Sequence, residues 1–128
     1  MNELKFRYVF KNKVFGDISI YYLTLKQVEQ GAVSKILNSG MKGNGYEVIS
    51  RDRYVGFKNK NGKEFYEGDI QSGVFYNHNT QSYDKKNGYI IFDNTRFYLH
   101  EINGKRNCEI NRYKEIIGNR FENSELLK

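Results

Sequence analysis

The chain has 128 residues, which is enough for one domain or for a small barrel with an extension, and too few for a two-domain enzyme. Only 38% of the residues are hydrophobic, and no apolar run approaches the roughly 20 residues that a membrane span needs. We therefore expect a soluble protein with no membrane partner. Aromatic residues make up 16% of the chain, and their rings bury large areas, which argues against disorder.

The charge allows an acidic partner, and the single cysteine indicates a reducing cytoplasm. Lys and Arg number 21 against 15 Asp and Glu, giving a net charge of +6 that allows an acidic partner without requiring one. The single cysteine, Cys108, excludes an intrachain disulfide, and residues 1–10 lack the pattern of a secretory signal. We therefore expect a reducing compartment.

Residues 1–52 predict a portion built of strands and a helical segment. Residues 4–10 alternate apolar and basic side chains, and residues 18–23 are rich in β-branched and aromatic ones, so both predict strands. Thr24 offers an N-cap oxygen, Gln27 completes a capping box, and apolar residues then recur at helical spacing as far as Leu37. Gly31 inside this segment leaves one helix and two short helices as equal alternatives.

Residues 53–128 show short runs of strand formers between turn residues, a pattern typical of a small antiparallel barrel or sandwich. The dipeptides Asn61-Gly62, Asn87-Gly88 and Asn103-Gly104 predict hairpin turns, and residues 77–82 predict a polar loop. From Tyr46 onward we expect strands at residues 46–49, 54–58, 63–66, 70–76, 89–92, 96–101, 109–113 and 115–119.

The candidate catalytic residues are few. His78 and His100 lie 22 positions apart without a cysteine or carboxylate at ligand spacing, so we predict no metal site. Glu64, Glu67 and Asp69 form the one carboxylate cluster, which could share a proton or bind a divalent ion but is better explained as a turn. The sequence therefore predicts no cofactor and no enzyme.

A basic cluster with interleaved aromatic side chains is the candidate binding site. Cations beside exposed rings are typical of surfaces that bind single-stranded nucleic acid. On alternating strands, however, the rings could equally face the core while the lysines lie in solvent. The candidate contacts are Arg51, Arg53, Tyr54, Lys58, Lys60 and Lys63.

Three segments carry a resemblance to a known family. Residues 56–70 read G-F-K-N-K-N-G-K-E-F-Y-E-G-D-I and resemble the block G-L-K-D-K-N-G-K-E-I-Y-E-G-D-I of the YopX family of phage and prophage proteins. Residues 115–127, E-I-I-G-N-R-F-E-N-S-E-L-L, are similar to the family's closing E-V-I-G-N-I-Y-E-N-P-E-L-L, and residues 3–7, E-L-K-F-R, to its start E-I-K-F-R. The chain departs from the family pattern at Ser124, where Pro is usual, and at Gln71, where Val is frequent.

The resemblance implies a C-terminal SH3-like antiparallel β-barrel, an N-terminal α/β portion, and residence in a bacteriophage or prophage. It implies no established biochemical activity. Turns and barrel closure explain the family-motif positions without a ligand. These positions are Gly56, Gly62, Tyr66, Glu67, Gly68, Asp69, Gly118, Asn119, Glu122 and Asn123.

Together these observations predict a mainly β, α+β chain, with a strand and helix portion at residues 1–52 and an SH3-like barrel at residues 53–128. Exposed strand edges, residues 18–23 and the apolar Leu126-Leu127 tail predict a homo-oligomer in the cytoplasm of a bacterial host. The expected function is a non-enzymatic module for protein interaction or assembly, with an unidentified phage or host protein as partner. The alternative is nucleic-acid binding through residues 42–63.

Overall fold

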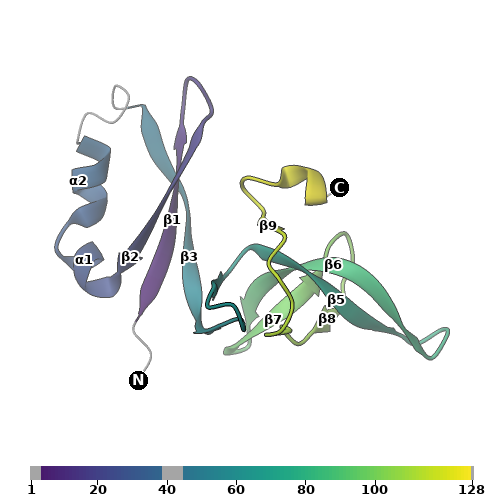
Figure 1. The fold of residues 1–128 in the computed structure, drawn as a ribbon. Coiled ribbons are helices and arrows are strands. Elements are labelled where there is room, and N and C mark those ends of the chain that lie inside the picture. The colour runs from purple at the N-terminus through teal and green to yellow at the C-terminus, as the bar shows by residue number, and fades with distance from the viewer. Residues whose placement is uncertain (1–3, 39–44, 128) are drawn as a thin grey trace. The chain divides into compact units, whose positions relative to one another are not determined.

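The computed structural model describes residues 4–38 and 45–127, and it shows a mainly β protein, as predicted (Figure 1). The chain divides into two compact units, residues 1–54 and 55–128. The predicted domain boundary after residue 52 stays a prediction. The elements are β1 (Lys5–Asn12), β2 (Ile18–Thr24), α1 (Leu25–Glu29), α2 (Ala32–Asn38), β3 (Tyr46–Lys58), β4 (Glu64–Tyr66), β5 (Asp69–Asn77), β6 (Ser82–Asp93), β7 (Arg96–Glu101), β8 (Asn107–Cys108), β9 (Gly118–Asn119) and the 3₁₀ helix η2 (Ser124–Leu127).

In the first unit, β1 lies between β2 and β3 in an antiparallel sheet, and α1 and α2 lie along that sheet (Figure 1). The buried cluster of the sheet is formed by Tyr8, Phe10, Leu23 and Tyr46. One apolar face of the two helices covers it with Val28, Ala32, Val33, Ile36 and Leu37. These side chains are only partly buried, so each contributes less than the ~1.5–3 kcal/mol of a fully buried large apolar side chain, but together they hold the short helices on the sheet.

The helical segment forms two helices rather than one. Gly31, between them, has a φ of +86°, a conformation that L side chains rarely adopt. The predicted capping box is confirmed, because Thr24 Oγ1 accepts a hydrogen bond from Gln27 N at 3.2 Å and Gln27 Oε1 accepts one from Thr24 N at 2.9 Å. Within residues 4–38 and 45–127, the helices are too short and too polar to cross a bilayer.

The second unit contains a five-stranded antiparallel sheet in the order β8-β7-β6-β5-β9. Phe65, Phe75, Ile90 and Leu99 form its buried core. Two glycines let Leu99 of β7 pack closely on β5 and β6, since a Cβ atom at Gly73 of β5 would lie 2.6 Å from Leu99 Cδ2, and one at Gly88 of β6 would lie 2.7 Å from Leu99 Cγ. Gly88 therefore sits inside β6, opposite Glu101 of β7, and the predicted hairpin turn at Asn87-Gly88 is wrong.

The SH3-like barrel that the family resemblance implies is not confirmed, because neither sheet closes on itself among the described residues. The five-stranded sheet ends in β8 and β9, two-residue strands that pair only with β7 and β5. β4 pairs instead with the end of β3 and so belongs to the other sheet. Because β4 pairs in one sheet and the short strands β8 and β9 end the other, the described strands form two open sheets and no closed barrel.

Several predicted strands have different bounds in the structure. Residues 46–49 and 54–58 belong to one strand, β3, and residues 89–92 are the end of the longer β6. Residues 109–113 form no strand, because the backbone N–H and C=O of Asn111 bond to the side chain of Gln71 instead of to another strand. The strand expected at residues 115–119 is reduced to β9, whereas β7 has the predicted bounds.

Candidate binding surface

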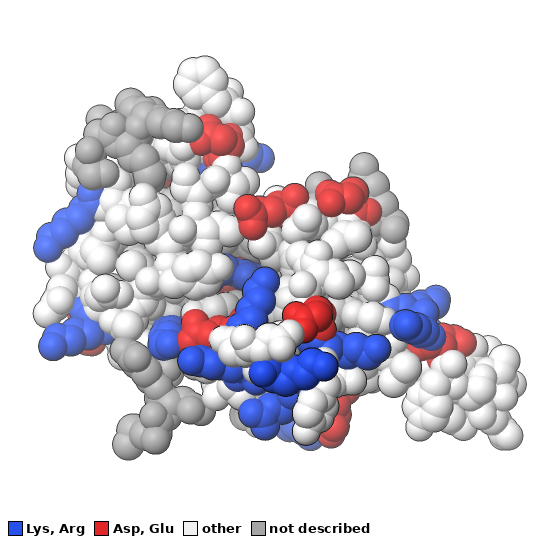
Figure 2. All heavy atoms as spheres, in the orientation of Figure 1, with Lys and Arg blue, Asp and Glu red and all other residues white. Residues whose placement is uncertain are grey.

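The predicted basic cluster is divided between the two units. Arg51, Arg53 and Tyr54 lie on the part of β3 that belongs to residues 1–54, whereas Lys58, Lys60 and Lys63 lie in residues 55–128. In the first set, the Arg51 guanidinium lies 5.3 Å from the Phe6 ring centre, and Lys5 Nζ lies 5.2 Å from that of Tyr54. Figure 2 shows Lys and Arg side chains exposed among acidic ones.

A hollow of about 330 Å³ in the second unit is lined by Lys58, Asn59, Lys60, Arg112 and Tyr113. The first three residues come from the end of β3 and the turn that follows, and the last two from the segment between β8 and β9. Both lysines are exposed, and the Tyr113 side chain is 75% exposed. The predicted cations Lys58 and Lys60 thus line the same hollow as Arg112 and Tyr113. The last two residues lie more than 50 positions further along the chain.

Arg112 is held over an aromatic ring at the edge of this hollow. Its guanidinium carbon lies 4.6 Å from the ring centre of Phe57, a side chain that packs against the core of the second unit. A guanidinium stacked in this way keeps its N–H donors at the rim of the plane, where an anion can accept from them. Phe57 therefore packs against the core of the second unit, and Arg112 lies over its ring.

The turn that carries the lysines is fixed by Asn59, which is 5% exposed. Its Oδ1 accepts hydrogen bonds from Asn61 N at 2.9 Å and from Lys63 N at 3.0 Å, and its C=O accepts one from Gly62 N at 3.0 Å. The turn predicted at Asn61-Gly62 is present, but only Gly62 has a positive φ, +83°, so it is not the two-residue type I′ turn. Local hydrogen bonds thus set the backbone between Lys58 and Lys63.

The other wall of the hollow is anchored to β5 by Gln71, which is 1% exposed. Gln71 Oε1 accepts from Asn111 N at 2.8 Å, and Gln71 Nε2 donates to Asn111 O at 3.1 Å. Asn111 Oδ1 in turn accepts from Tyr113 N at 2.9 Å. Because the donor and the acceptor of this buried side-chain amide are both hydrogen-bonded to Asn111, they fix the backbone next to Arg112 and Tyr113.

Glu115 connects the two walls. Its Oε1 accepts a hydrogen bond from Asn61 Nδ2, and its Oε2 accepts one from Asn59 Nδ2 at 3.5 Å. These contacts join the turn after β3 to the segment before β9. The hollow is therefore lined by cations on two loops that Glu115 joins. Two asparagine side chains, Asn59 and Asn61, contact the Glu115 carboxylate.

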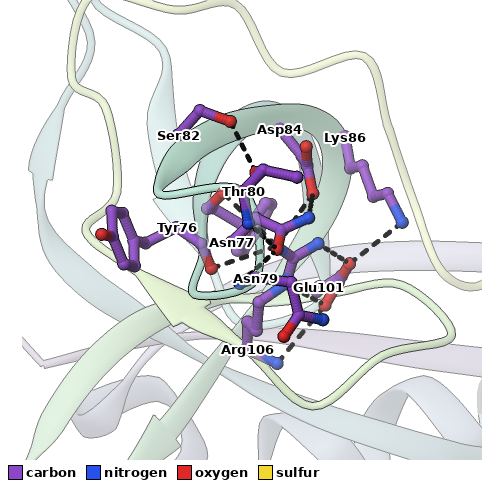
Figure 3. Close-up of polar contacts among 10 residues, drawn as sticks. Tyr76, Asn77, Asn79, Thr80, Ser82, Asp84, Lys86, Glu101 and Arg106 are labelled. Carbon is purple, nitrogen blue, oxygen red and sulfur yellow. Dashed lines mark hydrogen bonds and ion pairs between the residues drawn. The ribbon is translucent and has the colours of Figure 1, made fainter.

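A second polar cluster lies between the β5–β6 hairpin and the loop after β7 (Figure 3). Arg106 Nε and Nη2 donate to Glu101 Oε1 at 2.9 Å and Oε2 at 2.6 Å, and Arg106 Nη1 donates to Asp84 Oδ2 at 3.0 Å. Lys86 Nζ lies 3.3 Å from Glu101 Oε2. No sequence motif predicts this cluster, because Arg106 and Asp84 are 22 positions apart and only the pairing of the strands brings them together.

The charges of that cluster stabilise one another. The hydrogen bonds from Arg106 lower the pKa of Glu101 to about 2, against the opposing effect of burial. They also hold the pKa of Asp84 below its usual value, with a further contribution from Asn77, and Glu101 and Asp84 together raise the pKa of Arg106. Both carboxyl groups are therefore ionised at neutral pH, which suits a structural ion pair and not a proton-transfer site.

The carboxylate cluster Glu64, Glu67 and Asp69 lies in β4, in the turn after it and at the start of β5, and its contacts shape that turn. Asp69 Oδ2 accepts from Tyr66 N at 2.8 Å, and Glu64 Oε1 accepts from Tyr66 Oη at 2.9 Å. Glu67 is half-buried beside them, and Gly68 has a φ of +86°. Gly68 also packs against Arg120, since a Cβ atom there would lie 2.9 Å from Arg120 Nε.

The C-terminal motif forms a hydrogen-bonded turn after β9. Asn119 Oδ1 accepts from the backbone N–H groups of Phe121 and Glu122 at 2.9 and 2.8 Å, and Asn119 Nδ2 donates to Glu122 Oε1 at 2.9 Å. Asn123 Oδ1 accepts from Asn119 N at 3.0 Å, and a Cβ atom at Gly118 would lie 2.5 Å from that oxygen.

Another family-motif position, Gly56, lies in β3 and has a φ of +107°, a conformation that favours glycine.

Chemically reactive groups are few in the part of the chain that the structure describes. No cluster of three or more His, Cys, Asp or Glu residues there is arranged to hold a metal ion. Cys108 is half-buried on β8, and burial raises the pKa of its thiol, so the reactive thiolate is scarce at neutral pH.

Comparisons with known proteins identify the family of the chain. No curated protein matches the sequence significantly. The crystal structure of protein EF1440 from Enterococcus faecalis is similar over 100% of both chains, with 19% sequence identity and a TM-score of 0.45. The model of the YopX protein family matches residues 5–128, nearly the whole sequence. The resemblance seen in the sequence motifs is thereby confirmed, and the chain belongs to the YopX family.

Proposed function

We propose that the protein is a non-enzymatic assembly module of a bacteriophage or prophage, and that it binds a second copy of itself along the outer edge of β2. The observation that carries this proposal is the position of β2 at one end of the sheet order β2-β1-β3-β4, with no described strand on its outer side. An edge strand presents backbone N–H and C=O groups to which another strand can pair.

The composition of β2 supports its role as a pairing edge. Natural proteins protect edge strands with charged residues, prolines, bulges or a covering segment. The β2 sequence, I-S-I-Y-Y-L-T, has no charge, no proline and no glycine across its seven residues. Its Tyr21 and Tyr22 side chains are exposed, Tyr22 by 59%. Such a strand gains hydrogen bonds and apolar contacts when a second β2 pairs with it.

The other apolar segment that predicted an oligomer has a different place in the structure. Leu126 and Leu127 are half-buried in η2, and Leu127 accepts a hydrogen bond from Asn103 Nδ2 at 3.1 Å through its backbone oxygen. The proposal therefore rests on β2 alone. A phage or host protein that offers an extended strand is the other kind of partner that this edge would accept, and the cytoplasm of the bacterial host is the proposed location.

Light scattering coupled to gel filtration tests the proposal. The wild-type chain is expected at twice its 15.2 kDa mass at tens of micromolar, and Tyr22→Lys, which places a charge on the edge strand, is expected at the mass of one chain. Val74→Lys is the matched control, because Val74 is an exposed apolar residue on β5 in the other unit. A wild-type protein that remains monomeric, or a Tyr22→Lys variant that dimerises as well as the control, would contradict pairing through β2.

A further inference from the structure

We propose that the hollow lined by Lys58, Lys60, Arg112 and Tyr113 binds single-stranded nucleic acid, with backbone phosphates on the three cations and a base stacked on the Tyr113 ring. The site lies entirely within residues 55–128 and does not include β2. The inference therefore goes beyond the proposed assembly function and can fail without it.

The charges in the hollow fit an anionic chain. Three cationic side chains line a space of about 330 Å³, and Lys63 lies in the same turn. Arg112 is the best placed of them, because its stacking on Phe57 limits the rotamer entropy that a bound phosphate would otherwise cost. The volume is at the small end of the range for ligand sites, ~300–1,000 Å³, and suits one nucleotide of a strand at a time.

Tyr113 supplies the reason for preferring a single strand. Its ring is 75% exposed, although a tyrosine ring normally gains stability by burial, while its backbone N–H is fixed by Asn111. A ring beside cations offers a stacking surface to an unpaired base of any identity. In a duplex both faces of a base are already stacked on neighbouring bases, so no base face is free to stack on the Tyr113 ring.

The hollow is also organised before any ligand arrives. Asn59 fixes the turn with the lysines, Gln71 fixes the segment with Arg112, and Glu115 connects the two. The Glu115 carboxylate oxygens accept hydrogen bonds from the side chains of Asn59 and Asn61. An arrangement of this kind reduces the ordering cost on binding, which favours a defined site over a diffuse cationic surface.

Fluorescence anisotropy with the full chain and a labelled oligothymidylate of about 16 nucleotides tests the charge contacts. Binding is expected at ~50 mM salt, with log K falling by about 2 per tenfold rise in salt, the value for three phosphates on a single strand. The variant Lys58→Gln/Lys60→Gln/Arg112→Gln is expected to bind at least tenfold more weakly. The matched control Lys85→Gln/Arg96→Gln/Lys105→Gln removes the same number of charges at exposed positions of the same unit outside the hollow and is expected to bind as the wild type does.

A second pair of variants tests the stacking. Tyr113→Ala is expected to weaken binding about five- to a hundredfold, the effect of losing one stacked base, whereas Tyr83→Ala, at another exposed tyrosine, is expected to have no effect. The proposal is wrong if the wild type does not bind at ~50 mM salt. It is also wrong if the two tyrosine variants behave alike or if a duplex of the same length binds as tightly. Circular dichroism confirms that each variant is folded, so that a loss of binding is assigned to the hollow.

Discussion

Replacement of Glu101 by glutamine tests the polar cluster around Arg106. Glu101 is 5% exposed and accepts two hydrogen bonds from the Arg106 guanidinium, at 2.9 and 2.6 Å. Its pKa falls from the usual 4.5 to about 2, and each unit corresponds to 1.36 kcal/mol, so the ionised form gains up to about 3 kcal/mol from its partners. The Arg106 side chain is 28% exposed, and the resulting solvent screening lowers the expected loss in Glu101→Gln to about 2–3 kcal/mol.

The pH dependence of this loss follows from the direction of the pKa shift. A carboxyl group whose pKa is lower in the folded state stabilises that state fully above its unfolded pKa, here 4.5. The contribution disappears as the pH falls through the folded pKa of about 2, because both states are then protonated. Glutamine does not titrate, so the stability difference between wild type and Glu101→Gln should shrink as the pH falls from about 4.5 to about 2.

Urea unfolding followed by tyrosine fluorescence measures these differences, since the chain has 11 tyrosines and no tryptophan. Glu109→Gln is the control, because Glu109 is 88% exposed and lies 3.9 Å from Arg96, a surface pair worth less than about 1 kcal/mol. Equal stability of Glu101→Gln and wild type at neutral pH would refute the structural role of the cluster. A difference that stays constant down to the lowest pH would refute its electrostatic origin.

Three further predictions follow from single contacts in the second unit. Gln71→Leu leaves the N–H and C=O of Asn111 without their partners, so it should cost about 2 kcal/mol in urea unfolding and speed hydrogen exchange of the Asn111 amide, which unchanged exchange would contradict. Gly73→Ala forces a Cβ atom against Leu99 at 2.6 Å and should destabilise by about 1–3 kcal/mol in thermal unfolding, whereas an unchanged midpoint would mean that Leu99 moves easily. Cys108 should react with iodoacetamide more slowly in the folded protein than in denaturant, because burial raises its thiol pKa, and equal rates would contradict this.

The parts of the fold that the sequence predicts well depend on neighbouring residues. The capping box of Thr24 and Gln27 spans three positions, and the break at Gly31 comes from the backbone preference of one residue. β7 lies between turns that its own flanking residues form, and its bounds are as predicted. The family motifs are equally local, which explains why the chain could be assigned to the YopX family from its sequence.

The errors concern features that distant residues decide. Asn61-Gly62 and Asn87-Gly88 are the same dipeptide, yet the first forms a turn and the second continues β6, because Leu99 packs over Gly88 from the neighbouring strand. Residues 109–113 have the composition of a strand, but Gln71 takes the hydrogen bonds of Asn111 from 40 positions away. No local pattern contains that information.

The same limitation explains why only half of the candidate hollow could be found from the sequence. Lys58 and Lys60 belong to a recognisable cluster, whereas Arg112 and Tyr113 reach them only because Gln71 and Glu115 fix the later segment. Residues 56–70, which carry the family resemblance, include Lys58 and Lys60, but the two bonds to Asn111 come from Gln71, and a valine there could make neither. We therefore expect the hollow to depend on Gln71 as well as on its cations, and Gln71→Val should weaken oligothymidylate binding with every cation still present.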